Sequence, residues 1–140
     1  MSDIILRQDF TVSADRVFDA LADQDAMGSW MGAKISVPSR GEDGLVGTVR
    51  RVHLGPVGFD EQIIEAERPT RIVYQISSPV PLLVKHRGEI QVEAVGDRQS
   101  RVTWRVELKL QPDVVGAFVR PVLSMALSAA LKRLAAHLGR

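Results

Sequence analysis

The last apolar segment, residues 113–138, constrains the fold more than any other stretch, because nothing else in the sequence is long and apolar enough to form a central helix. Asp113 would place a negative charge at the positive end of the helix dipole, and Gly139 is suited to ending the helix. A helix of about 25 residues is a rod of roughly 38 Å at 1.5 Å per residue. The rest of the chain has to be organised around such a rod.

This segment carries two apolar stripes at helical spacing, and the stripes point in different directions. The first consists of Leu123, Leu127, Leu131, Leu134 and Leu138, and the second of Val115, Phe118, Val122, Met125 and Ala129. A helix that is apolar on two sides can turn only one of them to a sheet. We expect the other side to face an internal cavity, a partner chain or more of the core.

The composition is that of one ordinary domain, and it excludes several kinds of function. The 140 residues suffice for a single domain with a real core, which we place at 1–140. A formal net charge of +1 argues against electrostatic binding of nucleic acid or of an anionic membrane. The lack of cysteine rules out disulfides, thiol catalysis and cysteine metal sites.

The sequence at the two ends of the chain bears on where in the cell the protein is expected. Met1, Ser2 and Asp3 do not begin a signal peptide, since no basic region followed by an apolar stretch is present, and a cytoplasmic location is expected. Arg120, Lys132 and Arg133 interrupt the apolar C-terminal segment. From these charges we predict no stable membrane insertion.

Alternation of apolar and polar residues predicts seven strands. They are expected at residues 4–12, 34–39, 47–54, 59–67, 71–77, 84–95 and 101–110, with two short helices at 13–23 and 25–31 after the first strand. Short turns make the last six strands antiparallel. The predicted fold is therefore α+β: a curved, seven-stranded antiparallel sheet that buries one face against the long C-terminal helix.

Three pieces of the sequence carry a resemblance to a known superfamily. They are VFDALAD at 17–23 followed by Met27 and Trp30, EAERPTRIVY at 65–74, and VTW at 102–104 before the apolar helix. In this pattern the whole chain resembles the START-like, helix-grip (SRPBCC) superfamily, which includes the polyketide cyclase/dehydrase group. The resemblance implies a sheet that grips a long helix with an apolar cavity between them. Its members include lipid and hormone carriers and cyclases, and no motif here matches a cyclase active site.

His86 is the most informative polar residue. It shares strand parity with Val84, Gly88, Ile90 and Val92. If that parity faces inward, the imidazole points into the cavity, where it could act as a general base or hydrogen-bond a ligand carbonyl. The alternative is a histidine at a strand end near solvent.

Further ligand contacts are proposed from apolar parity and position. Tyr74 and Trp104 each combine a large apolar body with a polar tip, which suits a pocket wall that orients a ligand. Trp30 is expected at the mouth of the cavity. Gln62 is expected to contact the ligand from the face of its strand that looks the more apolar, whereas Glu61 and Glu65 lie on the other face and are expected in solvent. For each aromatic residue, ordinary core packing is the alternative. The expected cavity is lined by Tyr74, Trp104, Phe118, Val122 and Met125.

Three hypotheses of function follow. The first is binding, or transport, of a hydrophobic small molecule such as a lipid or polyketide-like aromatic, without a cofactor. The second is a cyclase/dehydratase-type enzyme with His86 as acid or base, since folding a reactive chain in a dry pocket needs few catalytic groups. The third is a protein-interaction module that forms a homodimer through the stripe containing Phe118. His53 and His137 stand in no metal-like spacing, so no metal site is expected.

Overall fold

The computed structural model describes residues 3–43, 45–54 and 56–139; Met1 and Ser2, used above in the signal-peptide prediction, lie outside this part. The elements follow in the order β1 (Ile4–Phe10), α1 (Ala14–Ala22), α2 (Gly28–Met31), β2 (Lys34–Ser39), β3 (Val49–Leu54), β4 (Val57–Glu67), β5 (Arg71–Ile76), β6 (Leu83–Gly96), β7 (Gln99–Leu110) and α3 (Asp113–Leu138). The α+β prediction is confirmed, and each element lies within a few residues of its expected place.

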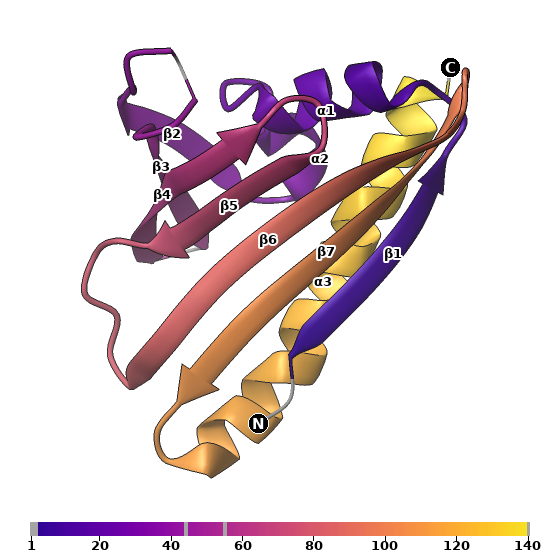
Figure 1. Cartoon of the computed structure of the whole chain (residues 1–140). Helices are drawn as coiled ribbons and strands as arrows, with labels where there is room; N and C mark the ends of the chain where they lie inside the picture. The colour runs from indigo at the N-terminus through magenta and orange to yellow at the C-terminus, as the bar shows by residue number, and fades with distance from the viewer. Residues whose placement is uncertain (1–2, 44, 55, 140) are drawn as a thin grey trace.

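The seven strands form one antiparallel sheet in the order β1-β7-β6-β5-β4-β3-β2. The first strand pairs with the last, so β1 lies at one edge of the sheet beside β7, and β2 lies at the other edge. The sheet curves strongly, α3 lies along its inner face, and α1 and α2 cover one end (Figure 1). This is the helix-grip arrangement expected from the sequence.

The local sequence explains where the short elements begin and end. Ser13 caps α1, because its side-chain oxygen accepts a hydrogen bond from the backbone N–H of Arg16 at 3.3 Å. Gly32 follows α2 with a φ of 80°, a left-handed conformation that glycine adopts without steric cost. The chain can therefore turn sharply from α2 into β2.

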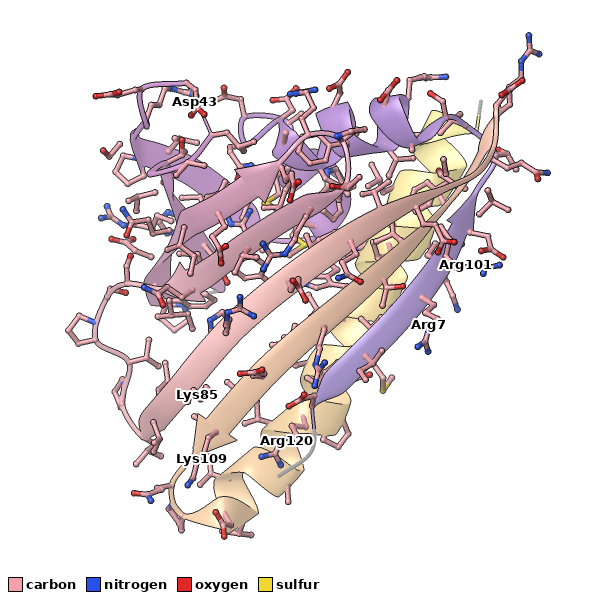
Figure 2. The ribbon with its side chains drawn as sticks, viewed as in Figure 1. Arg7, Asp43, Lys85, Arg101, Lys109 and Arg120 are labelled. Atoms are coloured by element: carbon pink, nitrogen blue, oxygen red, sulfur yellow. The ribbon has the colours of Figure 1, made fainter. Side chains whose placement is uncertain are left out.

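The leucine stripe of α3 is the side that meets the sheet. Leu127, Leu131, Leu134 and Leu138 are buried in the main core, together with Val102 and Trp104 of β7. Arg120 adds a polar link from the first half of the helix, since its Nη2 donates to the carbonyl oxygen of Leu108 at 3.2 Å (Figure 2). The helix is thus held to the sheet along its length, most tightly in its second half.

Most of the second stripe of α3 points outward, so the prediction that Phe118, Val122 and Met125 line the cavity is wrong, whereas Val115 of the same stripe does lie in the cavity wall. Phe118 is 76% exposed, Met125 is 75% exposed and Val122 is also exposed. The reason lies in the helical wheel: once the leucines are turned to the sheet, residues displaced from them by well over 100° must face away from it. The spacing identified both stripes, but nothing in it said which one the sheet would take.

The apolar character of α3 also bears on membrane association. Within the described chain it is the one helix long and apolar enough to cross a membrane by length and composition, with a mean hydropathy of 1.8 over an 18-residue window that is 22% buried. The charges of Arg120, Lys132 and Arg133 therefore do not by themselves exclude a membrane-spanning helix. Central helices of globular domains meet the same criterion, and the lack of stable membrane insertion stays a prediction.

Candidate functional site

A cavity of about 400 Å³ lies between the first half of α3, the inner face of the sheet and the loop at residues 77–82. Most of its wall is apolar. Val119, Leu123 and Leu127 come from α3, Val106 and Leu108 from β7, and Leu82 from the loop. Only three charged or hydrogen-bonding side chains, Glu61, Tyr74 and His86, contribute to the described wall. They come from β4, β5 and β6, three strands adjacent in the sheet.

Glu61 is held by a buried ion pair. Arg50 lies directly opposite it on β3, and Nε of Arg50 donates to Oε1 of Glu61 at 2.8 Å. Nη1 of Arg50 donates to the side-chain oxygen of Gln24 at 2.9 Å, and the Gln24 amide in turn donates to the carbonyl oxygen of Ala22 at 3.0 Å. Arg50 is only 2% exposed. The segment after α1 therefore fixes the guanidinium, which fixes one oxygen of the carboxylate.

Tyr74 forms the floor of the polar region. The Arg50 guanidinium lies over its ring at 4.6 Å, and Nε1 of Trp104 donates to its hydroxyl oxygen at 2.9 Å. A Cβ at Gly88, on the neighbouring strand, would lie 2.1 Å from the Tyr74 ring, so only glycine leaves room for it. Burial raises the pKa of Tyr74, with a smaller contribution from Glu61, and the phenol stays neutral at physiological pH.

His86 lies beside Tyr74 with its ring held in one tautomer. The backbone N–H of Ile76 donates to Nδ1 of His86 at 3.0 Å, so Nδ1 must be the unprotonated acceptor and the neutral ring carries its proton on Nε2. That Nε2 lies 4.0 Å from Oε2 of Glu61. Burial lowers the pKa of His86, although Glu61 pulls it the other way. The neutral imidazole is therefore a donor toward the cavity, which removes the general-base role at Nε2 considered above.

The charges of this region cancel. Arg50 and Glu61 carry opposite charges, His86 is neutral above its lowered pKa, and Tyr74 is a neutral phenol. No group of three or more His, Asp or Glu side chains suited to a metal ion occurs within the described ranges. The cavity is thus an apolar space with an electrically neutral, hydrogen-bonding end.

Not every buried donor is satisfied by protein. Among the described residues, Nη2 of Arg50, Nε1 of Trp30 and Nε of Arg120 are buried without a hydrogen-bond partner. Such groups are rare in folded proteins and require a water or a ligand nearby to offset the loss of hydration. Of these three donors, only Nη2 of Arg50 belongs to the cluster formed by Arg50, Glu61, Tyr74 and His86. That cluster can therefore donate one more hydrogen bond, to a water or a ligand.

A second hollow, of about 840 Å³, borders the same loop from outside. It is open to solvent, and it shares Ile76, Val80, Pro81, Leu83 and His86 with the cavity. The loop at residues 77–82 thus borders both hollows. Within it, Leu82 has a φ of 68°, an uncommon conformation for a residue with a large side chain.

The residues that the sequence proposed as ligand contacts do not all lie in the cavity wall. Tyr74 and His86 lie in the cavity wall, whereas Trp104 stands behind Tyr74 as its hydrogen-bond donor. Trp30 is a buried core residue outside the wall, and its carbonyl oxygen accepts a hydrogen bond from Nε of Arg133 at 2.9 Å. Its expected place at the cavity mouth is therefore wrong, because α2 turns the indole into the core and Met31 toward the cavity.

The inward face of β4 also differs from the prediction. Glu61 and Ile63 point inward, whereas Gln62 lies on the other face, with its amide 3.4 Å from the carbonyl oxygen of Gly47. A register shift between Ile63 and Glu65 explains the error, because it reverses the alternation and brings Ala66 against the core. Gln62 is thus not a cavity residue, and Glu61 takes the place proposed for it.

Sequence reasoning missed Gln24, Arg50 and Glu61. One available signal was the parity of Arg50 with Val52, a buried neighbour on the same strand. Another was the hairpin register, since the pairing of Leu54 with Val57 places Arg50 opposite Glu61. The sequence predicted a hairpin turn at 55–58 and therefore a strand that begins at residue 59, whereas β4 begins two residues earlier, at Val57. Gly55 of the predicted turn lies outside the described residues.

Comparison with known proteins agrees with this architecture. A family model described as polyketide cyclase / dehydrase and lipid transport matches residues 4–139. Among curated protein sequences there is no significant match.

Solved structures share the fold at low identity. A START superfamily protein from Mycobacterium smegmatis has a TM-score of 0.81 at 14% identity, over 96% of this chain and 95% of its own. The Zhui aromatase/cyclase from Streptomyces sp. R1128 has a TM-score of 0.81 at 16% identity, over 97% and 92%. The Aha1 dimer from Colwellia psychrerythraea has a TM-score of 0.73 at 18% identity, over 96% and 97%. At these identities the likeness is one of fold.

The buried ion pair predicts that replacing Arg50 lowers the stability of the fold much more than replacing its neighbour Arg51. Arg50→Met should lower the free energy of unfolding by about 3–5 kcal/mol, because it leaves the buried Glu61 carboxylate without its partner. Arg51→Met, whose ion pair with Asp60 is exposed to solvent, should change stability little. Urea unfolding of both variants measures the difference. Equal effects would show that the buried pair is not held as described.

His86 predicts a pH dependence of stability. Its pKa is lowered from 6.5 in the folded protein, so the unfolded chain binds the proton more readily and the contribution of the neutral ring is lost as pH falls below about 6.5. His86→Asn keeps an acceptor for the Ile76 N–H but cannot titrate. Between about pH 7.5 and about pH 5, the wild type should lose more free energy of unfolding than this variant. A loss of the same size in both would contradict the assignment.

Proposed function

The chain belongs to the polyketide cyclase/dehydrase and lipid transport family, and we propose that it binds a neutral, largely apolar small molecule in the cavity between α3 and the sheet. The cavity carries this proposal. Its volume of about 400 Å³, its apolar wall and its few converging polar groups have the features of small-molecule sites, which commonly span about 300–1,000 Å³.

The electrostatics support a neutral ligand. An ionised ligand entering the apolar space would lose its hydration, and Arg50 and Glu61 already neutralise each other, so the cavity offers no net charge to offset that loss. A lipid with an uncharged polar end or a polyketide-like aromatic compound would meet both the wall and its polar end. We expect a ligand to exchange with solvent past the loop at residues 77–82, because this loop borders both hollows.

An enzyme of the cyclase/dehydratase type is the second candidate. The observation that favours it is the pair formed by His86 and Glu61, which face each other across 4.0 Å in the cavity wall. In such a reaction the His86 Nε2–H would donate to a substrate oxygen and Oε2 of Glu61 would accept a proton. The Zhui neighbour is named as an aromatase/cyclase, which supports this possibility by fold alone.

A homodimer is the third candidate, and the outer stripe of α3 favours it. Phe118, Val122 and Met125 of the second stripe are exposed along one side of the helix, and Val114 takes the place there that was expected for Val115; we call these four residues the outer stripe. A second copy of the chain is the occupant we propose, because an isologous contact would cover the same stripe on both copies. The Aha1 neighbour is described as a dimer.

Cavity binding predicts that two adjacent substitutions on α3 differ in their effect on ligand affinity. Val119→Trp should fill part of the cavity and weaken binding of the neutral probe N-phenyl-1-naphthylamine by at least about tenfold, which is 1.4 kcal/mol. Phe118→Trp, one residue away on the exposed side, should leave the affinity unchanged. Fluorescence titration gives both values. If Phe118→Trp alone weakened binding, the probe would be on the outer stripe and cavity binding would be refuted.

The homodimer makes a separate prediction for the outer stripe. Phe118→Glu introduces a charge that a second apolar strip could not solvate, so it should convert a dimer into a monomer while leaving the cavity intact. Sedimentation equilibrium of the wild type and the variant tests this. A wild type that is monomeric at all accessible concentrations would rule the dimer out.

A further inference from the structure

The facing pair of Glu61 and His86 places a donor and an acceptor 4.0 Å apart in the cavity wall. Nδ1 of His86 is occupied by the Ile76 N–H, so Nε2 carries the hydrogen and can only donate. Oε1 of Glu61 is occupied by Arg50, and Oε2 takes no hydrogen bond from any residue that the structure describes. One free donor and one free acceptor therefore meet at the wall of the cavity.

The separation of these two atoms matches the size of one oxygen. At 4.0 Å, Nε2 and Oε2 are too far apart for a direct hydrogen bond. Two partners that each lie about 2.8 Å from a shared oxygen are roughly 4 to 4.6 Å apart when they subtend about 90° to 110° at it. A hydroxyl oxygen seated between them would accept from Nε2 and donate to Oε2. A water molecule could occupy the same position and be displaced by a ligand.

The geometry points to a hydroxyl-recognition site: the Glu61–His86 pair selects neutral ligands that carry an alcohol or phenol group at one end. This inference rests on the cavity binding proposed above and specifies which ligands bind there. A hydroxyl satisfies both atoms at once. A carbonyl would satisfy His86 but set its lone pairs against the Glu61 carboxylate, and a carboxylate ligand would be repelled by the same group.

Three neighbouring residues act on this site through Glu61 or His86. Arg50 holds Oε1 of Glu61, which leaves Oε2 as the free acceptor, and Gln24 holds Arg50. Tyr74 packs against the His86 ring with the ring centroids 5.6 Å apart, and limits its rotation. Arg50, Gln24 and Tyr74 are therefore positioning residues, whereas Glu61 and His86 contact the ligand.

Three naphthalene derivatives of similar shape test the inference. We expect 2-naphthol to bind about tenfold tighter than 2-methylnaphthalene, which fills the same space without a donor or acceptor, a difference of about 1.4 kcal/mol. We expect 2-naphthoate to bind more weakly than either. Isothermal titration calorimetry at neutral pH measures all three affinities with the full chain.

Two substitutions of His86 distinguish the loss of its hydrogen-bond donor in the cavity from a disturbance of the fold. His86→Asn places an amide oxygen near the position of Nδ1, where it can still accept from the Ile76 N–H, but it does not reach the cavity. It should bring the ratio of the two affinities, 2-naphthol over 2-methylnaphthalene, from about tenfold down to about one. His86→Gln extends an amide N–H to the position of Nε2 and should retain part of the preference.

The outcomes distinguish this inference from the function on which it rests. If 2-methylnaphthalene binds and 2-naphthol binds no tighter, or if the preference survives His86→Asn undiminished, hydroxyl recognition is overturned and cavity binding stands. If neither neutral compound binds the wild-type chain, the proposed ligand-binding function itself is contradicted, and the inference falls with it.

Discussion

The packing of the leucine face of α3 against β1, β7 and α2 is the interaction on which the rest of the structure depends. Leu127, Leu131, Leu134 and Leu138 bury the second half of the helix in the core. The first half remains over the curved sheet, where Val115 and Val119 face a cavity instead of a packed layer. Core and cavity are thus built from consecutive parts of one helix, and the same orientation leaves Phe118 and Met125 in solvent.

The polar end of the cavity depends on an ion pair that a fully apolar wall would not need. Burying Arg50 and Glu61 costs hydration, and a buried pair of this kind is weak evidence for stability. Its effect here is geometric: the guanidinium occupies one carboxylate oxygen, spans the Tyr74 ring and leaves the other oxygen facing His86. A backbone N–H fixes the tautomer of that histidine, so neighbouring strands determine which atom donates and which accepts.

Sequence periodicity predicted the fold well because the strongest patterns are local. The alternation along β7 and the leucine spacing of α3 required only neighbouring residues, and both are confirmed. Parity placed Tyr74 on an apolar face but left open whether His86 points inward or lies near solvent, and the structure places both in the cavity wall. Parity failed at β4, where the register shift after Ile63 reverses the faces, and on α3, where the choice between two apolar stripes is made by tertiary packing. Glu61 was missed because its ionic partner becomes visible only once the register of β3 with β4 is known.

We propose that an apolar ligand occupies the space under the first half of α3 and does not bind to the outer stripe of that helix. Intermolecular nuclear Overhauser effects from bound 2-naphthol to methyl-labelled protein test this most directly. The cavity predicts cross-peaks to the methyl groups of Val119, Leu123 and Leu127 and none to those of Val122 and Met125. Cross-peaks confined to Val122 and Met125 would contradict it.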